Sequence, residues 1–163
     1  MSDSQHSAGA IARALTDMEH GQLARARRRL KSYLIGHPTS MDARRLLAEL
    51  YRADGHPDEA GRWGYLLRSG ATTAERTAYE QACASRLTPD WTATYIRKGL
   101  HWDAPVKSAD PYAAGILRQL DAHAAAEAAN YHRAIDSILW NRIGRACARL
   151  RRWVGAATGR PTP

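Results

Sequence analysis

The chain has 163 residues, a net charge of +8 at pH 7 and only two cysteines. A chain of this length can bury its own core without disulfides or a structural metal. No run reaches the 18 apolar residues typical of a membrane-spanning helix, and residues 1–8 are polar, without a signal-like apolar stretch. We therefore expect a cytoplasmic protein with reduced cysteines.

Seven helix-length segments follow one another along the chain, separated by glycine- and proline-containing breaks. Alanine, leucine, arginine and glutamate dominate them, and these residues favour helix over strand. The segments cover residues 7–19, 22–35, 40–53, 57–69, 72–86, 89–100 and 111–154. The sequence predicts an all-α fold without a sheet, and residues 1–5 and 156–163 are expected to be disordered.

The first four segments repeat with a period of 34 residues. The matched pairs are Ala14 with Ala48, Gly21 with Gly55, and Ala26 with Ala60. Small residues where two helices cross, and a glycine where the first helix ends, are typical of tetratricopeptide repeats. The pattern predicts two tetratricopeptide-like hairpins, capped by residues 72–100, in a domain over residues 6–103. A generic helical bundle with coincidental spacing is the alternative.

Two stretches carry a resemblance to a known family. Residues 60–66 read Ala-Gly-Arg-Trp-Gly-Tyr-Leu, and residues 75–83 read Glu-Arg-Thr-Ala-Tyr-Glu-Gln-Ala-Cys. Over about residues 10–103, the chain resembles an uncharacterised family of small bacterial helical-repeat proteins. That family has no assigned activity, so the resemblance implies the helical-repeat fold and no mechanism.

Tetratricopeptide stacks bind peptides on a concave face that the first helix of each hairpin lines. The corresponding positions here are Ile11, Leu15 and Met18 in the first unit, and Arg45, Glu49 and Arg52 in the second. The first set is an apolar stripe at helical spacing, and the second set is charged. We therefore expect a groove for a peptide or a helix, unless another part of the chain covers the stripe.

Residues 25–31 form the densest basic run. Arg25, Arg28 and Arg29 share one helix face, which could contact phosphate groups. The outer face of a second hairpin helix is normally solvated, and no aromatic residues interleave this run to stack on bases. We therefore expect a solvated face and do not favour nucleic acid as a partner.

The segment over residues 111–154 combines positive charge with an apolar stripe. Residues 130–163 hold seven basic residues and one acidic residue, or +6 of the net +8, although codon bias in a GC-rich genome could also enrich arginine. The candidate contact residues are Ile135, Ile138, Leu139, Trp140, Ile143, Leu150 and Trp153. A basic amphipathic helix with tryptophans is typical of membrane-surface or partner-docking helices. Packing against the repeats is the alternative.

The sequence contains none of the common catalytic signatures. There is no serine nucleophile elbow, glycine-rich phosphate loop or pair of catalytic carboxylates, and His123 with Glu127 is too small a set for a zinc site. We expect a non-enzymatic interaction module, an adaptor or regulator without cofactor or metal, that binds a protein or peptide or self-associates. The alternative is a basic protein that acts at an anionic membrane surface or on nucleic acid through its C-terminal helix.

Overall fold

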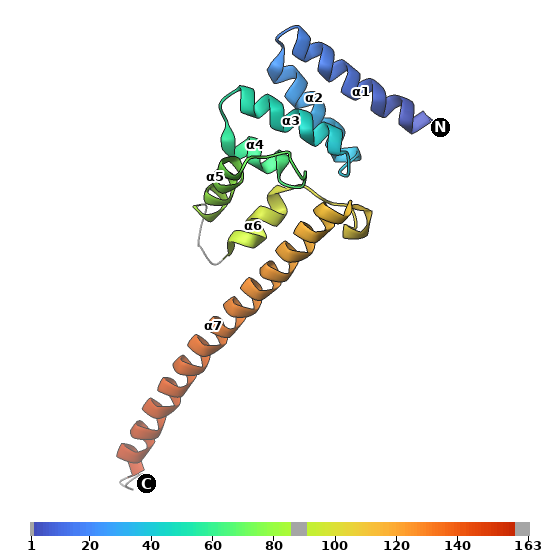
Figure 1. The fold of residues 1–163 in the computed structure, drawn as a ribbon. Coiled ribbons are helices and arrows are strands. Elements are labelled where there is room, and N and C mark those ends of the chain that lie inside the picture. The colour runs from blue at the N-terminus through green and yellow to red at the C-terminus, as the bar shows by residue number, and fades with distance from the viewer. Residues whose placement is uncertain (1, 86–90, 159–163) are drawn as a thin grey trace. The chain divides into compact units, whose positions relative to one another are not determined.

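A computed structural model describes residues 2–85 and 91–158, and the side chains of residues 9–85, 91–140, 142, 143 and 145. Its elements are α1 (Ser2–Glu19), α2 (Leu23–Gly36), α3 (Met41–Ala53), α4 (Pro57–Gly64), α5 (Thr73–Ala84), α6 (Thr92–Gly99), the 3-10 helix η2 (Val106–Ser108) and α7 (Pro111–Thr158) (Figure 1). The described part of the chain is mostly helical and contains no strand, which confirms the all-α prediction. Residues 2–5 and 156–158, expected to be disordered, belong to α1 and α7. The rest of those predicted tails, residues 1 and 159–163, lies outside the described residues.

The chain forms two compact units, Met1–Ala124 and Ala125–Pro163. The first unit contains α1 to α6 and the first turns of α7, and the second contains the rest of α7. Ala113, Leu117 and Leu120 of α7 belong to the same core cluster as Leu100 and Trp102. The end of the expected repeat domain, residue 103, therefore lies inside the first unit.

Within the first unit, each helix from α1 to α6 packs on the next one along the chain (Figure 1). The four repeated alanines, Ala14, Ala26, Ala48 and Ala60, are at most 1% exposed. Gly21 and Gly55 have φ angles of 71° and 74°, the left-handed region that favours glycine. The 34-residue period thus marks equivalent helix ends and buried small residues in the two hairpins.

Leucine at these alanine positions should destabilise the hairpins. Ala26→Leu and Ala60→Leu each place a larger, branched side chain at a position that is completely buried. We expect each substitution to lower the unfolding free energy by about 1–3 kcal/mol. The matched control is Ala24→Leu, at an exposed position of α2, which should change stability by about 0.5 kcal/mol or less. Urea denaturation measures all three. Equal midpoints for Ala24→Leu and Ala26→Leu would refute the proposed crossing.

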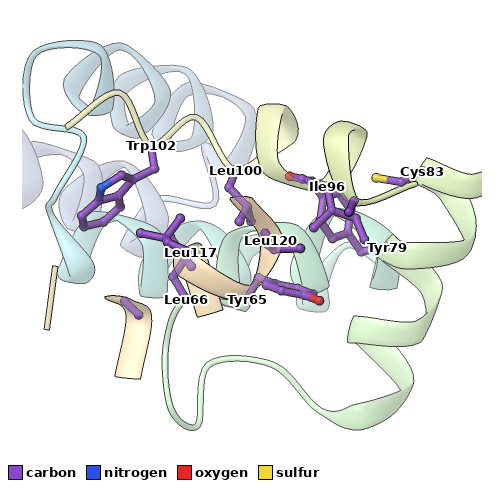
Figure 2. Packing of buried hydrophobic residues seen from close by; sticks show 11 residues of the cluster. Tyr65, Leu66, Tyr79, Cys83, Ile96, Leu100, Trp102, Leu117 and Leu120 are labelled. Carbon is purple, nitrogen blue, oxygen red and sulfur yellow. The ribbon is translucent and has the colours of Figure 1, made fainter. Parts of the chain in front are cut away.

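Two clusters of buried side chains hold the first unit together. One lies within the two hairpins and includes Leu30, Leu47 and Trp63. The other joins α5, α6 and α7 to Tyr65 and Leu66, which directly follow α4, and Figure 2 shows it with Trp102 near one end and Cys83 near the other. Each cluster removes apolar surface from water, which is the main favourable contribution to folding.

Helix α4 ends at Gly64, earlier than the predicted residue 69. A Cβ atom on Gly64 would lie 2.3 Å from the Gly70 carbonyl oxygen, and one on Gly61 would lie 2.0 Å from the Glu75 carbonyl oxygen. The chain therefore folds back directly over the end of α4, with Leu67 N–H donating to the Gly64 carbonyl at 3.0 Å. This close approach leaves no room for a larger side chain at Gly64.

Candidate functional site

The six predicted groove residues lie on α1 and α3, and both helices pack on α2. Leu15 is 41% exposed, whereas Ile11 and Met18 are half-buried. Arg45 donates to Asp42 at 3.1 Å, and Glu49 is exposed. None of the six lines the three described cavities.

The sixth predicted groove residue, Arg52, has hydrogen-bond partners within its own chain, and its side chain is 42% exposed. Its Nε and Nη2 donate to the Glu75 carboxylate at 2.6 and 2.9 Å, and Nη2 also donates to the Gly70 carbonyl at 2.9 Å. Glu75 is buried and accepts the Thr72 N–H at 2.7 Å, completing a capping box at the start of α5. Arg52 therefore joins α3 to α5.

This ion pair should make stability depend on pH. The hydrogen bonds from Arg52 are the main cause that lowers the pKa of Glu75 from 4.5 to about 2. Because the pKa is lower in the folded state, the contribution of Glu75 is complete above pH 4.5 and is lost as the pH falls towards 2. The stability difference between the native chain and Glu75→Gln should shrink by about 1–3 kcal/mol between pH 6 and pH 2.

Denaturant titrations of both proteins at several pH values measure this difference. Glu19→Gln, at an exposed carboxylate on α1, is the matched control and should follow the native chain at every pH. A constant difference between the native chain and Glu75→Gln from pH 6 to pH 2 would contradict the proposed role of Glu75.

The most apolar of the three cavities lies on α2 and α4 and measures about 420 Å³. Its lining consists of Lys31, Ser32, Leu34 and Ile35 of α2, Arg62 and Trp63 of α4, and His101 and Asp103 after α6. We call it the α2–α4 groove. Ile35 is 85% exposed, the most exposed large apolar side chain among the described residues.

Trp63 is the buried aromatic residue of the α2–α4 groove. Its indole N–H donates to Glu59 at 3.0 Å, which fixes the ring in place. The Arg62 guanidinium lies 5.0 Å from the ring centroid, and the His101 ring stacks on Trp63 with centroids 6.3 Å apart. The groove thus combines a fixed aromatic surface, a solvated aliphatic residue and charged side chains.

Arg44 positions the turn that carries His101 and Asp103. Its side chain is fully buried and donates to the carbonyl oxygens of Leu100 at 2.8 Å, His101 at 3.0 Å and Pro38 at 2.8 Å. Burial is the main cause that lowers the pKa of Arg44 to about 10, with a contribution from Arg62. The guanidinium therefore remains charged at neutral pH and binds the backbone of two segments, at Pro38 and at Leu100 with His101.

His101 adopts a φ of 46°, the only positive φ of a non-glycine residue in the described part of the chain. Its carbonyl accepts from Arg44 while its ring stacks on Trp63, and these two contacts account for the backbone conformation. Burial, followed by the charge of Arg62, lowers the pKa of the imidazole. The uncharged form of His101 is therefore favoured where its ring stacks on Trp63.

A smaller cavity of about 250 Å³ shares Arg62 and His101 with the groove. Arg62 donates to Glu59 at 3.1 Å and to the Gly99 carbonyl at 2.6 Å, and Tyr79 donates to the Ile96 carbonyl at 3.0 Å. These hydrogen bonds give Arg62 and Tyr79 partners within the chain and hold α6 against α4 and α5. No three His, Cys, Asp or Glu side chains of the described part lie close enough together to hold a metal ion.

A family model described as "Family of unknown function (DUF6584)" matches residues 6–141. The chain belongs to this family. The match confirms the expected membership of an uncharacterised family and extends beyond residue 103 to residue 141, within α7. No curated protein and no solved structure matched the chain.

The family match ends within the predicted C-terminal contact stripe, which lies in the second unit. Ile138, Leu139, Trp140 and Ile143 are between 49% and 71% exposed, and Ile135 is half-buried. Arg142 and Arg145 are exposed on the same helix. The side chains of Leu150 and Trp153 lie outside the described residues. No helix in the described residues has the length and apolarity needed to cross a membrane.

The residues of the α2–α4 groove were not among the sequence-predicted groove positions. Ile35 and His101 are 66 positions apart in the sequence, and no periodicity connects them. A weak signal exists at Ile35, an apolar residue on the second helix of a hairpin, directly before Gly36 ends that helix. The sequence does not show that Trp63 and His101 lie beside it.

Proposed function

We propose that this chain is a non-enzymatic protein-interaction module that binds an amphipathic helix of a protein partner in the α2–α4 groove. The observation that carries this proposal is the exposure of Ile35 beside the buried ring of Trp63. Exposed apolar side chains that border a concave apolar surface commonly mark contact sites. A partner side chain that covered Ile35 would gain the burial of apolar surface on both molecules.

The charges around the groove favour an amphipathic partner over a uniformly apolar one. Lys31 and Arg62 contribute positive charge and Asp103 contributes negative charge beside the apolar residues. A helix with apolar residues at spacings of three and four can place them against Ile35 and Trp63 while its polar side chains meet this charged rim.

The tetratricopeptide-like part of the proposal rests on the two hairpins. The buried alanines and left-handed glycines recur at a 34-residue spacing, as such repeats require. Cysteine use is low and the resemblance is to bacterial proteins, so we place the module in a bacterial cytoplasm. Its role as an adaptor or regulator is inferred from this architecture, because helical-repeat stacks present extended binding surfaces.

A synthetic peptide of residues 131–154 is a suitable probe, because it is amphipathic and available from a second copy of the chain. We expect the labelled peptide to bind the full-length protein in a fluorescence anisotropy titration. Ile35→Glu should weaken binding about tenfold or more, equivalent to about 1.4 kcal/mol, because it places a carboxylate against an apolar surface.

Leu15→Glu is the matched control, since it makes the same change at an exposed apolar residue of the predicted α1 stripe. It should alter the peptide affinity by about twofold or less. A larger loss from Leu15→Glu than from Ile35→Glu would assign binding to α1 and reject the α2–α4 groove. No effect from either substitution would reject both grooves.

The exposed stripe of the second unit favours a second candidate function, attachment to an anionic membrane surface. Trp140 and Ile138 could enter the headgroup region while Arg142 and Arg145 meet lipid phosphates. This alternative predicts that the full-length protein sediments with anionic liposomes and that about 0.5 M salt releases it. The absence of protein from the liposome pellet at low salt would reject it.

A further inference from the structure

The largest of the three described cavities, about 540 Å³, lies between α1 and α2 and is strongly basic. Arg13 lines it from α1, and Arg25, Arg28 and Arg29 line it from α2. Ala14 and Ala26 are completely buried, which is consistent with a close crossing of the two helices. The side chains beside that crossing therefore converge on one open cavity.

The charges in this cavity are only partly balanced within the chain. One carboxylate, Asp17, accepts from Arg29 Nε at 2.9 Å and lies 3.7 Å from Arg25 Nε. Arg13 and Arg28 have no ion pair and no side-chain hydrogen bond to any part of the chain that the structure describes. Four guanidinium groups and one carboxylate leave a net charge of about +3, and like charges repel at this range.

Not every arginine of the basic run lines this cavity, and the neighbouring Arg27 does not. Arg27 forms an ion pair with Asp54 and lies over the ring of Tyr51, 5.3 Å from its centroid. The run therefore divides into one arginine that joins the two hairpins and three that face the α1–α2 cavity.

We propose that the α1–α2 cavity binds a small ligand that carries two or more linked phosphate groups. Guanidinium groups bind phosphate oxygens through paired hydrogen bonds, and two linked phosphate groups supply about three negative charges near neutral pH against the net +3. Ser32 and Tyr33 also line the cavity, and their side chains carry hydroxyl groups, which can donate to phosphate. At about 540 Å³, this open cavity exceeds the space that one phosphate group needs.

Two features prepare the cavity for this ligand. Asp17, which is almost completely buried, orients Arg29 before a ligand binds. The Tyr33 ring stacks on His37 with centroids 4.3 Å apart, which limits its movement. Arg13 and Arg28 then supply charges that the fold itself does not use, so their removal tests ligand binding without removing a structural contact.

Isothermal titration calorimetry of the full-length protein with sodium pyrophosphate, at constant ionic strength, tests the proposal. We expect one binding site, with tighter binding of pyrophosphate than of orthophosphate. The double variant Arg13→Gln/Arg28→Gln should weaken pyrophosphate binding about tenfold or more. The control Lys107→Gln/Arg118→Gln removes the same charge at exposed residues outside the cavity and should change binding by about twofold or less.

Three results would overturn the proposal. They are the absence of pyrophosphate binding, equal weakening in the two double variants, and equal affinity for pyrophosphate and orthophosphate. Titration with a single-stranded oligonucleotide is a further test, because its phosphodiester groups carry one negative charge each. If the oligonucleotide binds through Arg13 and Arg28 while pyrophosphate does not, the cavity is a nucleic-acid contact and the small-ligand proposal is wrong.

Discussion

Replacement of Arg44 by methionine should lower the unfolding free energy by about 3–5 kcal/mol, one of the two largest effects that we expect from a single substitution. Methionine fills much of the same space but cannot donate a hydrogen bond. The carbonyl oxygens of Pro38, Leu100 and His101 would each lose a donor from Arg44. An unsatisfied buried polar group costs about 1–3 kcal/mol.

Urea denaturation of Arg44→Met and of the neighbouring variant Arg45→Met measures this effect. Arg45 is exposed and forms an ion pair with Asp42, so its replacement should cost about 0.5 kcal/mol or less. Arg44→Lys should recover only part of the loss, because one ammonium group cannot replace the guanidinium fork that reaches three carbonyls. A cost below about 1 kcal/mol for Arg44→Met would contradict the role of Arg44 in holding the turn.

Gly61→Ala should be comparably damaging, with an expected cost of about 3 kcal/mol. The added Cβ would lie 2.0 Å from the Glu75 carbonyl oxygen and 3.2 Å from the Arg76 nitrogen. Both contacts are to backbone, so α4 and α5 must separate to accept the methyl group. That separation would also disturb Glu75, whose carboxylate binds Arg52.

Gly115→Ala makes the same substitution in a helix where a Cβ meets no atom within 4 Å. It should raise stability by up to about 1 kcal/mol, because alanine favours helix more than glycine does. In thermal and urea unfolding, the change in unfolding free energy should therefore be negative for Gly61→Ala and positive for Gly115→Ala. A neutral Gly61→Ala would show that α4 and α5 do not approach as closely as described.

The helical fold was largely predictable, because its signals are local. Gly21 and Gly55 adopt the left-handed conformation that their position in the repeat implies, and Ala14 and Ala26 are buried as expected. The end of α4 was not predictable in the same way. It depends on how closely Gly64 approaches Gly70, and a pattern of helix formers and breakers does not contain that distance.

The candidate site was much less predictable than the fold. The repeat pattern predicts a groove on the first helix of each hairpin. One of the predicted groove residues there, Arg52, binds Glu75 and so has a structural partner. The α2–α4 groove instead needs Ile35, Trp63 and His101 to meet, and the position of His101 depends on hydrogen bonds from the buried Arg44. Such a site forms only after distant segments have packed.

The function that we propose depends on the location of partner binding. Two-dimensional ¹H–¹⁵N NMR of the full-length protein, titrated with the peptide of residues 131–154, tests that location most directly. We expect chemical-shift changes concentrated at residues 31–35, at Trp63, including its indole N–H, and at residues 101–103. Changes concentrated on α1 and α3, or no changes at a saturating peptide concentration, would contradict the assignment of partner binding to the α2–α4 groove.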